Sequence, residues 1–270
     1  MDKDITNLLY KISNEIEHTV VFSADGRYAG WPANYGVWSW GDEIVTGFTL
    51  GFHDTEGGFH SRDTKKPFVS MQSRSLDGGV TWETIQAPLL APGNVAISAG
   101  EHMKHIGLSP ISEGLNAPVQ SPGGIDFANP DFAMLCARNG LTRGAESWFY
   151  TSTDRCHSWN GPYSLPMFGQ LGIAARTDYL TYGPKKFQRA TLLLTSTKPD
   201  GEEGRVFCAR TEDGGTSFKF ISWLRATPPG FDIMPASTEL GPGHIICAIR
   251  SRDSSGARNW IDLMRSDNDG

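Results

Sequence analysis

Arg176, Asp178 and Tyr179 form a short group of side chains with the chemistry to hold a sugar. They close the run of residues 172–179, which reads as the start of a β-strand. Arginine and aspartate can hydrogen-bond hydroxyl groups, and an aromatic ring can stack on a sugar ring. Because side chains alternate along a strand, Arg176 and Asp178 should face one side and Tyr179 the other. The alternative is an internal Arg–Asp pair that joins neighbouring parts of the fold.

A second candidate group lies in the polar loop of residues 53–66. The loop is long and contains glycine, as expected of a mobile loop beside an active site. Its carboxylate nearest to the following strand is Asp63, and the neighbouring Arg62 and His60 could bind an anionic group of a substrate. The alternative is a solvated loop that carries charges of both signs.

One eight-residue pattern recurs along the chain and must organise the elements that position these groups. Its order is hydroxyl, any residue, Asp or Asn, any residue, usually Gly, any residue, hydroxyl, aromatic. Copies start at Ser75, Ser152 and Thr211, and a partial copy starts at Ser266. The pattern predicts a tight hairpin in which Asp accepts backbone N–H bonds, Gly supplies a positive φ and the aromatic ring packs under the turn. Its recurrence every 55–77 residues indicates a repeat architecture with one copy per sheet.

Strand-like runs precede each copy in pairs, and they are rich in aliphatic and aromatic residues. The first members of the pairs are residues 43–48, 132–138, 191–195 and 244–250, and the second members are residues 68–74, 148–151, 205–210 and 260–265. Only residues 5–16 show a helical apolar period. With 31 Gly and 16 Pro in 270 residues, the chain has the turns that many short strands require. We therefore expect an all-β protein.

Charge and composition exclude some partner classes. A formal net charge of −6 argues against a general nucleic-acid or membrane-surface role. The N-terminus has no export signal, so we expect a cytoplasmic protein, or a secreted one if a signal was removed. The cysteines have no metal-ligand spacing, and we expect buried free thiols. The His102–His105 pair has no third metal ligand near it in the sequence and is expected in a surface loop.

The repeated pattern resembles the Asp-box, or BNR repeat, of the sialidase (neuraminidase) superfamily. The resemblance extends from about Arg27 to the end of the chain and implies a six-bladed β-propeller in a single domain, residues 1–270. About four blades can be counted, so the chain looks C-terminally truncated. Their approximate ranges are residues 20–90, 120–168, 172–225 and 230–270.

The resemblance also implies roles for individual residues. Asp63 lies closest to the position of the family's catalytic acid, and Arg250 matches an arginine that binds the substrate carboxylate. Gly30 stands where the family has its first arginine. Arg27 could replace that arginine from another angle, or could be a turn residue.

Three elements of the family's apparatus are not found. The Glu that activates the family's nucleophile should fall near Met234, a position without a carboxylate here, and Glu239 lies five residues further on; the nucleophilic Tyr and the third arginine have no match.

Three hypotheses follow. The first is a sialidase-like glycoside hydrolase that removes terminal, possibly acidic, sugars from glycans, with Asp63 as the acid and no cofactor or metal. Arg27, Arg62, Arg176, Asp178, Tyr179 and Arg250 would then bind the substrate. The second is a non-catalytic propeller that binds a glycan or small carbohydrate, and the third is an interaction propeller without a sugar site. The oligomeric state is left open.

Overall fold

The computed structural model describes residues 16–94, 96–98 and 115–270. Most of the predicted helix (residues 5–15) and the His102–His105 pair lie outside these residues. In the described part the chain is all-β, with four antiparallel sheets and 3₁₀ turns only (Pro32–Asn34, Gly58–His60, Pro92–Asn94 and Pro184–Lys186). No helix in this part has the length and apolar character needed to span a bilayer.

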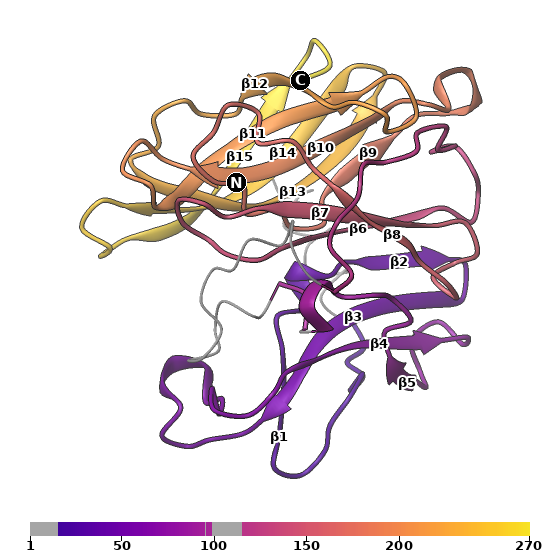
Figure 1. Cartoon of the computed structure of the whole chain (residues 1–270), viewed down its shortest axis with the longest axis vertical. Helices are drawn as coiled ribbons and strands as arrows, with labels where there is room; N and C mark the ends of the chain where they lie inside the picture. Colours follow the sequence, from indigo (N-terminus) through magenta and orange to yellow (C-terminus); the bar gives the residue numbers. More distant parts are fainter. Residues whose placement is uncertain (1–15, 95, 99–114) are drawn as a thin grey trace, which may run out of the picture.

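The sheets follow one another along the chain, and Figure 1 shows the first (indigo) and the fourth (yellow) at opposite ends of the molecule. The first sheet contains β1 (Arg27–Gly30), β2 (Val37–Trp40), β3 (Glu43–Phe52), β4 (Val69–Ser75) and β5 (Glu83–Gln86). The second contains β6 (Ala133–Arg138), β7 (Ser147–Ser152) and β8 (Asn160–Ser164). The third contains β9 (Tyr179–Thr181), β10 (Ala190–Thr197), β11 (Glu203–Thr211) and β12 (Lys219–Trp223). The fourth contains β13 (Gly230–Gly241), β14 (His244–Asp253) and β15 (Asn259–Ser266).

All eight strand-like runs predicted from the sequence are strands, with ends that differ by a few residues. The four sheets lie within the four predicted blade ranges. The described residues do not form a closed ring of six sheets, and the blade count stays a prediction.

The middle sheets are buried on both faces, which explains their unbroken apolar sequences. Along β6, Met134 and Cys136 belong to the apolar core shared with the third sheet, while Leu135 belongs to the core shared with the first. Along β10, Leu192 and Leu194 face the second sheet and Leu193 faces the fourth. Alternate side chains of one strand therefore fill two different cores.

The repeated pattern forms the predicted turn between the last two strands of the first three sheets. The Asp carboxylate accepts bonds from the backbone N–H and the hydroxyl of the residue four positions later. The N–H···O distances are 2.9 Å for Thr81, 3.0 Å for Ser158 and 2.9 Å for Ser217. The corresponding hydroxyl distances are 2.6, 2.5 and 2.6 Å.

Glycine has the predicted positive φ in two of these turns, at Gly79 (95°) and Gly215 (82°). In the second turn Arg155 and Cys156 take φ values of 56° and 65°, which side chains rarely adopt. The second copy therefore keeps the turn at a cost in backbone strain.

Each turn also docks on its own sheet, through a regularity that the sequence pattern does not reveal. The residue after the Asp or Asn donates its N–H to a carbonyl just before the strand that pairs with the strand leading into the repeat. The donor–acceptor pairs are Gly78–Asp42, Arg155–Asp131, Gly214–Gln188 and Asp269–Gly243.

Two of these residues reach the neighbouring sheet as well. Arg155 forms a 3.0 Å ion pair with Glu43 of the first sheet. Asp269 pairs with Arg189 of the third sheet and lies 3.7 Å from Arg210. The four repeated turns, which we call the outer turns, therefore close their own sheets, and the second and fourth also link adjacent sheets.

The cysteines are buried and free, as predicted. Burial raises the pKa of the Cys208 thiol to about 11 and that of Cys247 to about 12. Both thiols are therefore protonated at neutral pH.

Candidate functional site

The predicted site residues fall into two separate groups, with Arg250 and Tyr179 outside both. One group lies on the first sheet and the loop after β3, and the other, Arg176 and Asp178, lies just before β9. Arg250 stands apart. It is exposed on β14, and its guanidinium contacts the Met234 sulfur at 4.0 Å.

The first group contains an aromatic surface with a cation. Trp31 follows β1 in a left-handed conformation (φ 56°), which brings its ring 5.1 Å from Tyr28 and 5.6 Å from Phe68. Arg62 lies over the Trp31 ring at 5.3 Å, and His60 meets the ring edge-on at 5.5 Å. Phe59, 5.0 Å from His60, is 97% exposed. We call Trp31, Phe59, His60 and Arg62 the loop surface.

The electrostatics of the loop surface leave one fixed positive charge. Burial, and then the nearby Arg62 charge, lower the pKa of His60, so His60 is neutral at pH 7. The Arg62 Nε is buried and has no hydrogen-bond partner among the described residues. The loop surface thus combines apolar ring faces with a guanidinium.

Asp63 follows this surface directly, and its contacts are those of a turn. Its Oδ1 accepts the Lys65 N–H at 2.9 Å and its Oδ2 lies 3.4 Å from the Lys66 ammonium. The Lys65 N–H bond, followed by the interactions with Lys66, lowers the pKa of Asp63. The carboxyl group is therefore ionised at neutral pH, whereas a general acid must be protonated.

Arg27 is held by the same sheet. Its Nε donates to the Gly51 carbonyl at 2.7 Å, and its guanidinium lies 4.5 Å from the centre of the Phe52 ring. Lys66 approaches that ring at 4.7 Å. The structure therefore brings Arg27 and Asp63 to one end of the first sheet, around Phe52.

The second group consists of four buried polar side chains, Asn34, Arg138, Arg176 and Asp178, and the half-buried Glu203; we call these five residues the inner polar cluster. Arg176 is 4% exposed and donates to Glu203 at 2.5 Å. An internal ion pair exists at Arg176, but with Glu203 instead of Asp178.

Asp178 instead joins the third sheet to the fourth. Its Oδ1 accepts the backbone N–H of Ser237 at 3.1 Å and the Ser237 hydroxyl at 2.9 Å. Its Oδ2 is buried and has no hydrogen-bond partner among the described residues. Burial raises the pKa of Asp178 to about 6, against the effect of the Ser237 bonds. This carboxyl group can take up or release a proton near neutral pH.

Tyr179 points away from both groups into the core. Its hydroxyl oxygen accepts bonds from the Trp38 indole at 3.1 Å and the Met134 N–H at 3.2 Å. Burial raises its pKa to about 12. In this position Tyr179 connects the first three sheets.

Sequence reasoning missed the Asn34–Arg138 pair. Arg138 is 2% exposed and donates to the Asn34 carboxamide oxygen at 3.2 Å and to the Ala175 carbonyl at 3.2 Å. The available signal was an arginine at the end of a strand whose every residue is buried. An arginine in such a place must have buried partners.

Comparison with solved structures shows a fold shared with known proteins at low sequence identity. The first match is a Dyadobacter fermentans protein of unknown function (TM-score 0.61, 16% identity, 93% of this chain and 69% of that one). A second is described as NanB plus Optactamide (TM-score 0.56, 13% identity, 97% of this chain and 54% of that one). A third is a glycosyl hydrolase from Bacteroides ovatus (TM-score 0.50, 14% identity, 87% of this chain and 69% of that one).

Sialidases are also among the structural neighbours. Trypanosoma rangeli sialidase matches at a TM-score of 0.46 with 16% identity, over 88% of this chain and 36% of that one. No protein-family model and no curated protein matches the sequence. The chain thus shares its all-β fold with a glycosyl hydrolase, and it spans 69% and 54% of the first two matched chains.

Proposed function

We propose that this chain belongs to a glycan-binding protein, and that its four sheets are consecutive blades of a sialidase-like β-propeller. The observation that carries the proposal is the loop surface. Sugars bind proteins through aromatic rings that stack on their C–H faces and through charged groups that bond their hydroxyl or carboxylate oxygens. Trp31, Phe59 and Arg62 supply both kinds of contact within one loop region.

Binding without turnover is the function that the geometry supports best. Asp63 is held ionised by its turn. Arg176 is buried against Glu203, and Tyr179 is hydrogen-bonded in the core. The glycosyl hydrolase with the same fold supports a carbohydrate ligand. The expected cytoplasmic location stays a prediction.

The test is a titration of the whole chain with neutral and acidic monosaccharides and oligosaccharides, followed by tryptophan fluorescence and calorimetry. We expect saturable binding that Phe59→Ala weakens at least tenfold and that Arg62→Gln weakens most for acidic sugars. Val80→Ala is the matched control, because Val80 is also exposed (65%) in a loop but lies outside the loop surface. Equal affinity of Phe59→Ala and the parent chain would exclude the loop surface as the sugar site.

Glycoside hydrolysis is the second candidate, and Asp178 favours it. A carboxyl group with a pKa of about 6 could donate a proton near neutral pH. A screen of 4-methylumbelliferyl glycosides that includes the sialoside tests this candidate. Product release that Asp178→Asn abolishes and Asp63→Asn leaves unchanged would establish hydrolysis with Asp178 as the acid. Release that only Asp63→Asn abolishes would restore the role expected from the sequence.

A further inference from the structure

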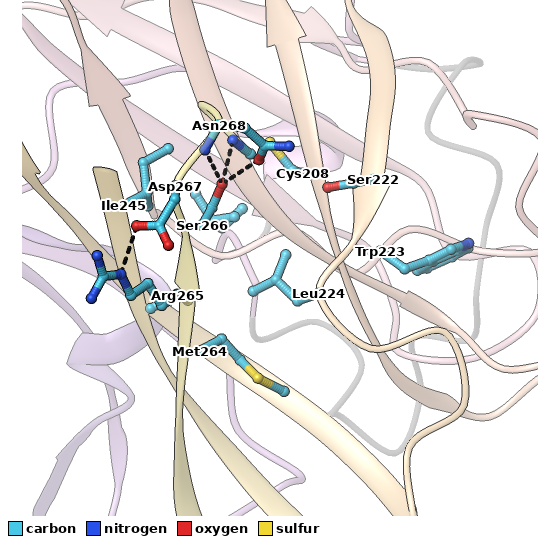
Figure 2. Close-up of a pocket in the computed structure, with 13 residues that line it drawn as sticks. Cys208, Ser222, Trp223, Leu224, Ile245, Met264, Arg265, Ser266, Asp267 and Asn268 are labelled. Atoms are coloured by element: carbon cyan, nitrogen blue, oxygen red, sulfur yellow. Dashed lines mark hydrogen bonds and ion pairs between the residues drawn. The ribbon is translucent and has the colours of Figure 1, made fainter. Parts of the chain in front are cut away.

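Two pockets between neighbouring sheets differ in the polar groups that they leave for a ligand. The pocket in Figure 2, of about 550 Å³, lies between the third and fourth sheets, and most of its lining is apolar. On one side of it, Arg265 donates to Asp267 at 2.6 Å. These two charges therefore already neutralise each other.

A second, shallower pocket, of about 480 Å³, lies between the turns that precede β6 and β10. Its lining consists of Asp126, Ala128, Asn129, Pro130, Pro184 and Phe187, and we call it the turn pocket. Asp131 and Gln188, which follow the two turns, accept the N–H bonds of the second and third outer turns. The turn pocket therefore lies at the outer-turn end of the sheets, whereas the loop that carries Phe59 and Arg62 follows the other end of β3.

Backbone bonds hold the two walls of the turn pocket together. The Phe127 N–H donates to the Phe187 carbonyl at 2.7 Å and so joins the two turns directly. The Phe127 ring is 1% exposed and lies 5.4 Å from the Phe132 ring. The Phe132 N–H in turn donates to the Asn129 carbonyl at 3.1 Å. Because the walls are fixed in this way, little conformational entropy is lost when a ligand binds between them.

The polar part of the turn pocket offers a hydrogen-bond acceptor and a donor. Asp126 Oδ1 accepts the Ala128 N–H at 2.9 Å, and Asn129 Oδ1 accepts the Asp131 N–H at 2.8 Å. The Asp126 Oδ2 and the Asn129 amide hydrogens have no partner among the described residues. A sugar hydroxyl can both donate and accept a hydrogen bond, so two neighbouring hydroxyls match a carboxylate oxygen and an amide.

The rest of the lining is apolar. The Phe187 ring is 44% exposed, and Pro130 and Pro184 also line the pocket. An exposed aromatic ring can stack on the C–H face of a sugar. The described lining contains no lysine or arginine, and the nearby Lys186 ammonium lies 5.6 Å from the centre of the Tyr182 ring.

The charge of the turn pocket is opposite to that of the loop surface. Asp126 is the one charged side chain in the described lining, so an acidic sugar is repelled there. The loop surface has Arg62 instead, which attracts an acidic sugar.

We propose that the turn pocket is a second glycan site, specific for a neutral sugar. The proposal rests on the proposed function for the class of its ligand, and it adds a site of the opposite charge preference at the other end of the sheets. The Phe187 ring stacks on the sugar, Asp126 accepts a bond from one hydroxyl, and Asn129 donates a bond to the next.

The probes are the methyl glycosides of glucose, galactose and mannose, each compared with its uronic acid counterpart. They are titrated by calorimetry into the whole chain carrying Phe59→Ala, which removes one aromatic ring of the loop surface. We expect saturable binding of at least one neutral glycoside and weaker binding of its uronic acid counterpart. Adding Phe187→Ala should weaken the neutral glycoside about tenfold, because the stacking ring is lost.

Two further variants complete the test. Asp126→Asn keeps an oxygen for the Ala128 N–H but replaces the free acceptor with a donor. It should weaken the neutral glycoside and reduce the discrimination against the uronic acid. Leu171→Ala is the matched control, because Leu171 is also partly exposed (40%) but lies outside the turn pocket.

Unfolding midpoints check that each variant folds. Equal affinities of the Phe187→Ala and Leu171→Ala chains would overturn the turn pocket, as would tighter binding of the uronic acid than of its neutral counterpart. If Phe59→Ala alone abolished the binding seen with the parent chain, the sugar would lie on the loop surface. That result would overturn the turn pocket and leave the proposed function intact. No saturable binding of the neutral glycosides would also overturn the turn pocket, whereas the loop surface fails only if acidic sugars do not bind either.

Discussion

The pKa values of the outer-turn aspartates and of Asp178 in the inner polar cluster are shifted in opposite directions. Asp77, Asp154 and Asp213 accept several hydrogen bonds from their own turns, and these bonds lower their pKa values, to about 2 for Asp77. Asp178 is buried, and its pKa is raised to about 6. The turn aspartates are local devices that favour the charged form, whereas Asp178 serves long-range packing and favours the neutral form.

This comparison predicts that the inner polar cluster is the less tolerant of substitution. Asn34→Ala removes an acceptor from the buried Arg138 guanidinium and a donor to the Ser98 carbonyl. We expect it to lower the free energy of unfolding by about 3 kcal/mol. Urea denaturation measures the change, and Asn259→Ala at the exposed start of β15 is the control. If Asn34→Ala lowered the free energy of unfolding by less than a substitution in an outer turn does, the comparison would be reversed.

The two kinds of aspartate should also differ in the pH dependence of stability. Asp178 has a folded pKa of about 6 against an ordinary value of 3.8, so it binds its proton more tightly in the folded state. Its stabilisation is complete below pH 4 and is lost as the pH rises through 6, by roughly 3 kcal/mol in total. Asp178→Asn should remove this fall between pH 4 and pH 7.

The turn aspartates have the reverse sign. Their folded pKa values lie below 3.8, so their stabilisation is present above that pH and is lost as the pH falls through the lowered values. Unfolding midpoints of the parent chain and Asp178→Asn from pH 3 to pH 8 separate the two effects. Parallel profiles of the two proteins would contradict the assignment to Asp178.

Within the outer turns, Asp213→Ala should lower the free energy of unfolding by about 1–2 kcal/mol, because the hydrogen bonds from Ser217 and Thr211 are lost together. Asp213→Asn should cost less, since the amide keeps one acceptor oxygen and Asn268 holds the same place in the fourth turn. Thermal unfolding of both variants gives the order. Equal losses would show that charge, and not the accepted bonds, holds the turn.

The smallest effect distinguishes two glycines with the same conformation. Gly78 and Gly214 have φ values of 72° and 67°, but a Cβ at Gly78 would meet nothing closer than 3.8 Å, whereas one at Gly214 would lie 2.8 Å from the Gly124 backbone. Gly78→Ala should therefore lower the free energy of unfolding by about 1 kcal/mol, because of its positive φ alone. Gly214→Ala should lower it by about 1 kcal/mol more, because of the added steric contact. Equal unfolding free energies of the two variants would mean that the Gly124 segment moves aside.

Sequence reasoning succeeded where the determining contacts are local. The strands follow from apolar runs, and the turns follow from bonds within a few residues, as between Asp77 and Thr81. It failed where partners are distant in the sequence: Arg138 and Asn34 are 104 residues apart, and Asp178 and Ser237 are 59 residues apart. Alternation predicted Arg176 and Asp178 on one side of a strand, but β9 begins only at Tyr179, and the packing of the sheets assigned Arg176 to Glu203 and Asp178 to Ser237.

The links made by the outer turns have a consequence for the order of the sheets. The second turn presents the cation Arg155 to Glu43, and the fourth presents the anion Asp269 to Arg189. If the two turn sequences were exchanged, arginine would face arginine at one seam and aspartate would face glutamate at the other. The second and fourth sheets are thus matched by charge to the neighbours that they meet, and a chimera in which these two turns were exchanged would assemble with like charges in contact.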